Sequence, residues 1–336
     1  MSNSRPIKTV EMHTGGEPLR IITEGYPEIC GDNILEKRRY VRENLDHLRH
    51  LLMFEPRGHF DMYGALLLSP SNPEADFAVL FLHNEGYSTM CGHAIIALGR
   101  YAVDQQLVQV CEPITTVKIE CPCGLVVASV EVTKGKSGKV SFLSVPAFAF
   151  SIDQELNVEG YGSIQYDIGY GGAFYALVSA TQLGLDVKSS PSRDLVDAAD
   201  AITSAVKSAI KLSHPDSDDL AFLYGTILTD GRDTYSSDPT ANICVFADRQ
   251  VDRSPTGSGV TARIAVQFSK QMIKTNQPRV FESITGSLFT AEIMENFPLD
   301  PHETVRVKVS GKAYYLGEST FSYEEGDEIG RGFLLK

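Results

Sequence analysis

Hydrophobic and polar residues alternate along many short segments of the chain, which is the spacing of half-buried β-strands. The segments with this pattern are residues 8–12, 78–82, 117–132, 140–145, 226–229, 242–247 and 305–309. Four further segments predict helices. Residues 33–53 are amphipathic, and residues 193–212 have apolar residues at helical spacing. Residues 94–105 are mostly apolar on every side, and residues 259–273 begin apolar and turn polar. Strands that are this frequent around a few helices predict an α+β protein rather than a regular βαβ alternation.

The chain also contains an internal similarity. HTGGE (13–17) and GYGGA (169–173) each follow a short apolar strand, and MCGHAIIALGRYAV (90–103) resembles PTGSGVTARIAV (255–266). The second pair aligns Cys91, Gly92 and His93 with Thr256, Gly257 and Ser258. A repeated glycine turn followed by a repeated turn-to-helix tip predicts two similar halves, with a boundary near residues 144–146.

Each tip opens a predicted helix, so it presents free backbone N–H groups and the positive end of a helix dipole. If the halves face each other, both helix starts point into one cleft, which favours a small anion. The chain has no GxxxxGK(S/T) sequence, and no GxGxxG follows a predicted strand. A carboxylate therefore fits these tips better than a phosphate does.

Composition narrows the possible partners. The chain has 336 residues, 43% of them hydrophobic and 22% charged, and a formal net charge of −13. Without a basic block, nucleic acid and an anionic membrane are poor partners. No apolar secretory segment opens the sequence, and no run approaches the roughly 18 apolar residues of a membrane span. We expect a cytoplasmic protein that acts on a small molecule.

The positions of the cysteines suggest a chemical role for Cys91 and structural roles for Cys121 and Cys123. Cys121 and Cys123 lie close together in a predicted hairpin, but no second group of ligands accompanies them, so we expect structural roles and no metal. Cys91 stands at a helix start, where the dipole favours a thiolate. His93 could hydrogen-bond its sulfur or a bound carboxylate. The alternative is that Cys91 is a buried structural cysteine.

Other polar residues leave alternatives open. Asp252 could bind a cationic amine, or it could pair with Arg253 and cap the turn. His13 could face the cleft or serve as a turn residue. His83-Asn84-Glu85 is a polar patch that leads into the Cys91 turn, and the structural alternative is that Asn84 and Glu85 simply satisfy backbone N–H groups of that turn. His59 lies in a predicted loop over residues 55–64. Neither GxSxG nor HExxH occurs, which argues against a serine hydrolase elbow and a zinc protease.

EMHTGGEP (11–18), FEPRGHFDMYGA (54–65), MCGH (90–93) and DRSPTGSG (252–259) together resemble the proline racemase family, and the resemblance covers essentially the whole chain. It implies a fold like that of diaminopimelate epimerase, with two pseudo-symmetric halves, each with β-structure around a central helix, and an active site in the cleft between them. The implied domains are residues 1–145, completed by 316–336 and carrying Cys91, and residues 146–315, carrying Asp252 and Thr256. A homodimer without cofactor or metal is also implied.

In the racemases and epimerases of this family, two cysteines flank the α-carbon of the substrate. Cys91 matches the first, but Thr256 occupies the place of the second, and its hydroxyl is too weak an acid to cycle as a base at neutral pH. Members with this threonine resemble enzymes that dehydrate trans-3-hydroxy-L-proline. That activity, with Cys91 as the base for the α-proton, is the expectation. The residues implied to bind substrate are Gly92, His93, Asp252, Gly257 and Ser258. The alternatives are a proline racemase or hydroxyproline epimerase, and a non-catalytic binder of small carboxylates.

Overall fold

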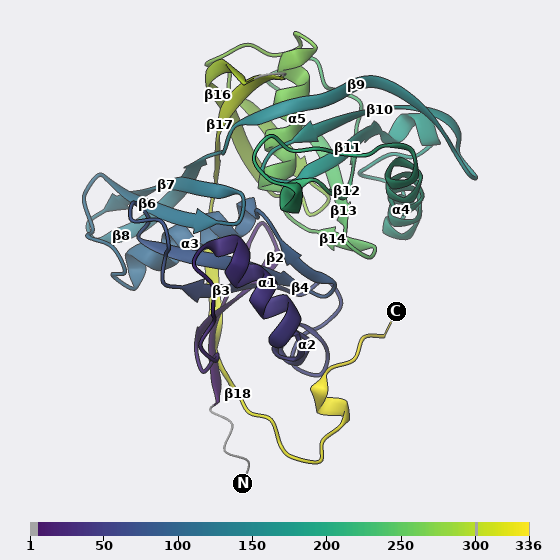
Figure 1. The fold of residues 1–336 in the computed structure, drawn as a ribbon. Helices are drawn as coiled ribbons and strands as arrows, with labels where there is room; N and C mark the ends of the chain where they lie inside the picture. Colours follow the sequence, from purple (N-terminus) through teal and green to yellow (C-terminus); the bar gives the residue numbers. More distant parts are fainter. Residues whose placement is uncertain (1–5, 300–301, 336) are drawn as a thin grey trace. The chain divides into compact units, whose positions relative to one another are not determined.

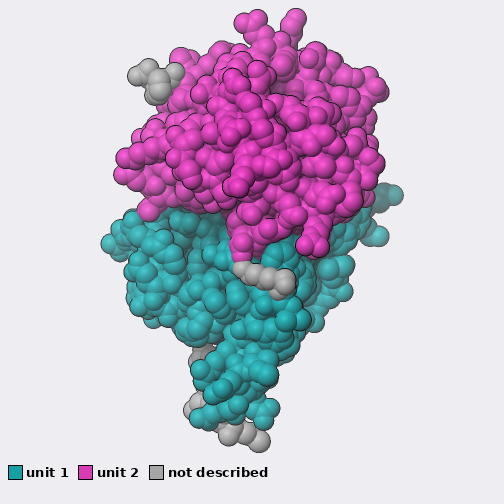
Figure 2. All heavy atoms as spheres, turned by 90° about the vertical axis from the view of Figure 1, so that its right-hand side faces the viewer, with its two compact units in different colours: residues 1–90, 94–140, 312–336 teal, residues 91–93, 141–311 magenta. Residues whose placement is uncertain are grey.

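The computed structural model describes residues 6–299 and 302–335. Contacts divide the chain into two compact units, which Figure 2 shows in different colours. Unit 1 comprises residues 1–90, 94–140 and 312–336, and unit 2 comprises residues 91–93 and 141–311. Within the described ranges, no helix is long and apolar enough to cross a membrane.

Unit 1 is built around a mixed sheet (Figure 1). Its strands are β1 (Ile7–Thr14), β2 (Glu17–Glu24), β3 (Tyr63–Leu68), β4 (Phe77–His83), β5 (Gly86–Ser88), β6 (Ile114–Cys121), β7 (Gly124–Thr133) and β18 (Ala313–Phe321), and β8 (Lys136–Leu143) continues into unit 2. The pairing order is β18-β1-β2-β3-β4-β6-β7, in which β2–β3 and β4–β6 are parallel and the other pairs antiparallel. The short β5 pairs with β4.

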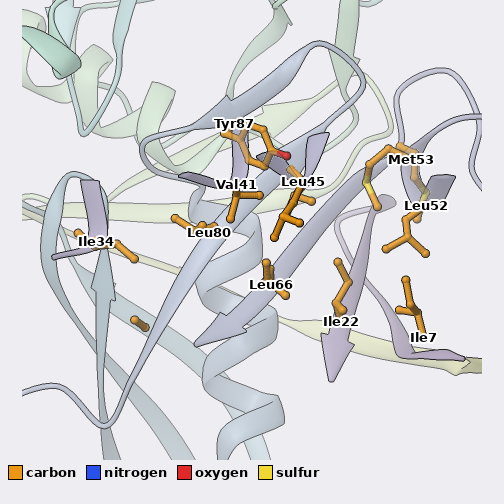
Figure 3. Close-up of a cluster of buried hydrophobic side chains, with 13 residues drawn as sticks. Ile7, Ile22, Ile34, Val41, Leu45, Leu52, Met53, Leu66, Leu80 and Tyr87 are labelled. Atoms are coloured by element: carbon orange, nitrogen blue, oxygen red, sulfur yellow. The ribbon is translucent and has the colours of Figure 1, made fainter. Parts of the chain in front are cut away.

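The segment predicted as one helix over residues 33–53 forms two, α1 (Ile34–Asn44) and α2 (Asp46–Met53). The break lies at Leu45, whose φ of −125° and ψ of 13° are not helical. Val41 and Leu45 from one side and Leu52 and Met53 from the other still enter one buried cluster (Figure 3). The break thus lets both short helices bury their apolar faces, which a straight helix with one apolar stripe would not do.

Unit 2 closes its strands into a ring. They are β9 (Ala147–Val158), β10 (Gly162–Tyr170), β11 (Phe174–Ser179), β12 (Leu223–Thr229), β13 (Thr240–Phe246), β14 (Gln250–Asp252), β15 (Arg279–Ser283), β16 (Leu288–Leu299) and β17 (His302–Gly311). The order β9-β10-β11-β12-β13-β15-β16-β17 returns to β9. Because every strand in this order has two neighbours, the sheet is a closed barrel without a free edge.

Helix α5 (Gly257–Ser269) packs against β9, β10, β11, β16 and β17, so the barrel wraps around it (Figure 1). Its residues are buried from Gly257 to Gln267, as expected of a helix that is surrounded on all sides. The remaining helices are α3 (Gly92–Asp104) and α4 (Ser192–Ala209), with 3-10 turns at Ala180–Leu183, Asp218–Leu220 and Ile329–Arg331. The chain is therefore mostly β with few helices.

The same order of pairing types occurs in both units. In unit 1, β1–β2 is antiparallel, β2–β3 is parallel and β3–β4 is antiparallel. Strand β4 then pairs with β5 antiparallel and with β6 parallel, and β6–β7 is antiparallel. In unit 2, β10 to β16 repeat this order, with β13 in the place of β4. A glycine turn thus joins the first two strands of each series, and a tip with a helix follows the fifth.

Candidate active site

Cys91 lies between β5 and α3, immediately before the first residue of the helix. Its Sγ is 3.1 Å from Nδ1 of His93, and only 5% of Cys91 and 2% of His93 are exposed. At this distance a proton can pass between thiol and imidazole, which is how a nucleophilic or basic thiolate is usually generated.

Asp252 is the last residue of β14 and is buried. Its Oδ1 accepts a hydrogen bond from the backbone N–H of Ser254 at 2.8 Å, and its Oδ2 lies 3.9 Å from Nδ1 of His93. The first contact is the turn cap that the sequence suggested. The second places a carboxylate beside the Cys91–His93 pair, so this cluster holds a potential base and a potential binding group for a cation.

Thr256 precedes α5 and has an unusual backbone. Its φ is +67° and its ψ is 94°, a region that costs a residue other than glycine about 1–3 kcal/mol. A threonine before a helix normally caps it with its side-chain oxygen, but this one makes no such bond. Thr256 Oγ1 is buried and has no hydrogen-bond partner among the described residues, so the hydroxyl is available for a bound molecule.

The starts of α3 and α5 meet backbone to backbone. A Cβ placed on Gly92 would lie 2.4 Å from Cα of Gly257, and a Cβ on Gly257 would lie 2.6 Å from Cα of Gly92. Only glycine fits such an approach. The first N–H groups of a helix have no partner within it, so two sets of donors converge next to Cys91 and Thr256. Such a cluster of donors favours a carboxylate.

Ser258, in the first turn of α5, has a partner that the sequence did not indicate. Its Oγ is 2.7 Å from the hydroxyl of Tyr175, on β11. Burial raises the pKa of Tyr175 well above 10, which keeps this hydroxyl protonated. An aromatic residue within an apolar strand is usually a core residue, so no sequence signal distinguished Tyr175 from its hydrophobic neighbours.

The glycine turn at 169–173 acts on the same helix. A Cβ on Gly171 would lie 2.1 Å from the carbonyl oxygen of Ser258, and one on Gly169 would lie 2.8 Å from that of Ala262. These two glycines let the strand β10 and the turn after it touch the first turns of α5. The repeated glycine motif thus shapes the site through close packing.

The family model described as proline racemase matches residues 9–334. The chain belongs to the proline racemase family. It is 61% identical over 332 residues to a protein of Xenopus tropicalis named trans-L-3-hydroxyproline dehydratase, covering 98% of this chain and 95% of that one. It is 57% identical over 336 residues to the human trans-3-hydroxy-L-proline dehydratase, with the same coverage.

A solved structure of the same fold is a hydroxyproline epimerase from Agrobacterium vitis with bound trans-4-hydroxy-L-proline. It superposes with a TM-score of 0.93 at 27% identity, covering 100% of this chain and 97% of the epimerase. The proline racemase-like fold expected from the sequence is therefore confirmed.

In this proline racemase family member, the residues predicted to carry chemistry all lie in unit 2: Cys91, Gly92, His93, Asp252, Thr256, Gly257 and Ser258. The structure brings Cys91, His93 and Asp252 together, and it places the backbones of Gly92 and Gly257 in contact. Their roles in binding and catalysis stay predictions.

The other candidates have local structural partners in unit 1. Asn84 donates to the carbonyls of Met53 and His59 and accepts from the N–H of Asp61, so it holds the loop over residues 55–64. His13 accepts from the N–H of Gly16 in its turn. Cys121 Sγ donates to the carbonyl of Ile119 at 3.9 Å, and neither Cys121 nor Cys123 is part of a disulfide.

Proposed function

We propose that this protein dehydrates trans-3-hydroxy-L-proline to Δ1-pyrroline-2-carboxylate and water, without a cofactor. The observation that carries the proposal is the pair of touching helix starts, with Cys91 before one and Thr256 before the other. The names of the relatives at 61% and 57% identity support the same reaction.

Cys91 acts as the base in this proposal. Its proton passes to His93, 3.1 Å away, and the thiolate then removes the α-proton of the substrate. The electron pair left on the α-carbon moves toward the carboxylate. The backbone N–H groups of Gly92, His93, Gly257 and Ser258 stabilise this growing charge, because donors fixed in place need no reorganisation as charge develops.

Asp252 binds the ring ammonium in the proposed complex. Its carboxylate is buried, with Oδ1 accepting from the N–H of Ser254 and Oδ2 3.9 Å from Nδ1 of His93. A buried carboxylate that gains a cationic partner is stabilised by that partner. The ammonium at Asp252 and the carboxylate at the helix starts would together orient the α-carbon.

Water leaves from the face that loses the proton. In trans-3-hydroxy-L-proline the carboxylate and hydroxyl are on opposite faces of the ring, so the α-hydrogen and hydroxyl share a face. The C3–O bond breaks as the α-carbon pair forms the Cα=Cβ double bond, and the hydroxyl takes a proton from the Cys91 thiol or from His93. The resulting enamine tautomerises to Δ1-pyrroline-2-carboxylate. One acid–base group therefore suffices.

Racemisation or epimerisation is the second candidate, which the likeness to the Agrobacterium vitis epimerase favours. That reaction needs a proton donor on the opposite face. We place Thr256 there, where its unpartnered hydroxyl can hydrogen-bond but cannot exchange protons at a useful rate. L-proline incubated in D2O separates the two functions, because an isomerase would yield α-deuterated D-proline and a dehydratase would not.

Trapping of the cyclic imine tests the main proposal. Wild-type protein incubated with trans-3-hydroxy-L-proline should yield the trapped product. Cys91→Ser should lower the rate on the order of 10³-fold, within the range of general acid–base catalysis. Cys30→Ser is the matched control, because Cys30 is an exposed free thiol, and it should keep the wild-type rate. Absence of imine with the wild-type protein would refute the proposed reaction and leave the isomerase and the non-catalytic binder as candidates.

We propose two further properties, a division into two similar halves and a homodimer. The repeated order of pairing types supports two similar halves, with boundaries as predicted at residues 1–145 plus 316–336 and residues 146–315. The resemblance to the family supports a homodimer. Light scattering of the purified protein would measure its mass and test the dimer.

A further inference from the structure

We infer that Asn242 and Arg263 are positioning residues that hold the Thr256 tip in its left-handed conformation. The inference rests on the proposed function, because it gives the tip its importance for the reaction. Both residues lie outside the motifs that carry the resemblance to the family. Neither has chemistry of its own at the substrate.

The tip is held on one side by its own turn. The N–H of Thr256 donates to Oγ of Ser254 at 3.1 Å, and the N–H of Val260 donates to the carbonyl of Thr256 at 2.7 Å. These contacts fix Thr256 relative to its immediate neighbours. They do not fix the turn relative to the barrel.

Asn242 links the barrel to the peptide bond that precedes Thr256. It lies on β13, is 1% exposed, and donates from Nδ2 to the carbonyl of Pro255 at 3.2 Å. This carbonyl belongs to the peptide bond whose nitrogen is that of Thr256, so the contact restrains the peptide plane that sets its φ. A residue in a sparsely populated backbone region persists only where its surroundings over-determine it.

Arg263 in turn fixes the amide of Asn242. Its Nη1 donates to Oδ1 of Asn242 at 3.1 Å, so this oxygen accepts from Arg263 while the nitrogen faces Pro255. Both ends of one side-chain amide are therefore used, and rotation of the amide would break two buried hydrogen bonds. Arg263 is itself 1% exposed and lies on α5, the helix that begins just after Thr256.

The guanidinium is anchored on its far side. Its Nη2 donates to Asp233 Oδ1 at 2.7 Å and to Thr240 Oγ1 at 2.9 Å, and Gln267 also donates to Asp233. Burial alone would raise the pKa of Asp233, but Arg263 and Gln267 hold it below its ordinary value. Asp233 is therefore ionised and keeps Arg263 in place, so the connection runs from Asp233 through Arg263 and Asn242 to the tip.

Asn242→Asp tests the inference with little change in shape. The carboxylate can still accept from Arg263, but it cannot donate to the carbonyl of Pro255. We expect kcat to fall on the order of 10- to 100-fold, as for other misplaced reacting groups, with KM changed less than about threefold. Amide hydrogen exchange over residues 253–260 should become faster, because the bond from Val260 to Thr256 loses its support.

Thr226→Val is the matched control. Thr226 is fully buried on the neighbouring strand β12, and its hydroxyl bonds that of Thr203 at 2.7 Å. This variant loses a buried hydrogen bond that does not touch the tip, so kcat and exchange over residues 253–260 should stay at wild-type values. Asn242→Ser, which removes both contacts without adding a charge, serves as a second variant if Asn242→Asp does not fold.

Unchanged exchange over residues 253–260 in the folded Asn242 variant overturns the inference, whatever the activity. Faster exchange in that variant, with wild-type exchange in Thr226→Val, supports it. Failure of the proposed reaction is read separately, from the absence of imine with the wild-type protein. The positioning of the tip can therefore be judged even if the substrate assignment is wrong.

Discussion

One imidazole nitrogen connects the polar groups of the candidate site. Nδ1 of His93 lies 3.1 Å from Cys91 Sγ and 3.9 Å from Asp252 Oδ2, so protonation of this nitrogen can balance either a thiolate or a carboxylate. A single thiol–imidazole pair is sufficient for a reaction that removes a proton and a hydroxyl from the same face. It is not sufficient for inversion, which requires a second proton donor across the ring.

Thr256→Cys tests this difference at one residue. A thiol can exchange protons near neutral pH, whereas a threonine hydroxyl cannot, so the variant should gain racemase-like exchange, in which L-proline becomes α-deuterated D-proline, and the wild type should not. Formation of α-deuterated D-proline in D2O, measured by mass spectrometry after chiral separation, gives the result. Thr256→Ser is the matched control and should gain no exchange. If Thr256→Cys gains none either, the opposite-face placement of residue 256 is wrong.

Residues within the turns were predictable from the sequence, and those that support the turns were not. Cys91, His93, Asp252 and Thr256 lie in short glycine-rich motifs whose position before a helix could be read directly. Tyr175 and Asn242 come from strands in which an aromatic or an amide residue is ordinary. Their contacts with Ser258 and Pro255 depend on which strands are neighbours in the barrel, and no local pattern encodes that.

At the scale of elements, glycines at the starts of α3 and α5 allow the two helices to approach each other closely. The predicted α3 and α5 were correct to within a few residues, because each is a long, largely apolar stretch that follows a glycine turn. The long helix predicted over residues 33–53 was wrong in being continuous. A non-helical Leu45 that stays in the core leaves the hydrophobic spacing almost unchanged, so periodicity does not reveal the break.

Gly257→Ala tests the contact between the helix starts. The added methyl would lie 2.6 Å from Cα of Gly92 and 3.1 Å from Phe142, so the backbones must separate. We expect a loss of about 1–3 kcal/mol in the free energy of unfolding, the usual cost of overpacking, together with most of the activity. Urea unfolding measures the first and imine formation the second.

Gly138→Ala in β8 is the matched control, because its methyl would meet Glu131 at an ordinary distance of 3.4 Å. It should leave stability and activity near wild type. Equal losses of stability and activity in the two variants would mean that the close approach between Gly92 and Gly257 is not important for either property.

At the scale of the whole molecule, most predicted strand segments are present, but closure of the barrel in unit 2 was not predictable. Alternation in residues 226–229, 242–247 and 305–309 identified parts of β12, β13 and β17. The pairing of β17 with β9 closes the ring between residues that are distant in sequence. Hydrophobic spacing reports which face of a strand is buried, and it carries no information about the strand's partner.

Stability should fall in mild acid through His214. Its ring packs against the aromatic rings of Tyr170, Phe148 and Phe174. Burial lowers its pKa, an effect that nearby His302 reinforces and Asp216 opposes. The neutral ring also accepts the N–H of Asp216 through Nδ1. The folded state thus disfavours the proton that the unfolded chain binds near pH 6.5.

The stabilising contribution of neutral His214 is complete above about pH 6.5 and declines as the pH falls toward its lowered pKa in the folded state. Thermal unfolding between pH 7.5 and 5 should therefore show a decreasing melting temperature. His214→Gln should make this decrease shallower, since glutamine does not titrate. An identical pH profile for the variant would exclude His214 as a source of the acid sensitivity.

The Gly92–Gly257 contact has a consequence for how the family's sequences can be interpreted. Any Cβ at one position collides with the backbone of the other, so no compensating change at the partner residue can rescue it. Compensation is what creates covariation between positions in an alignment. Two sites that reject every substitution leave no such record, so covariation analysis would not detect this contact between the helix starts.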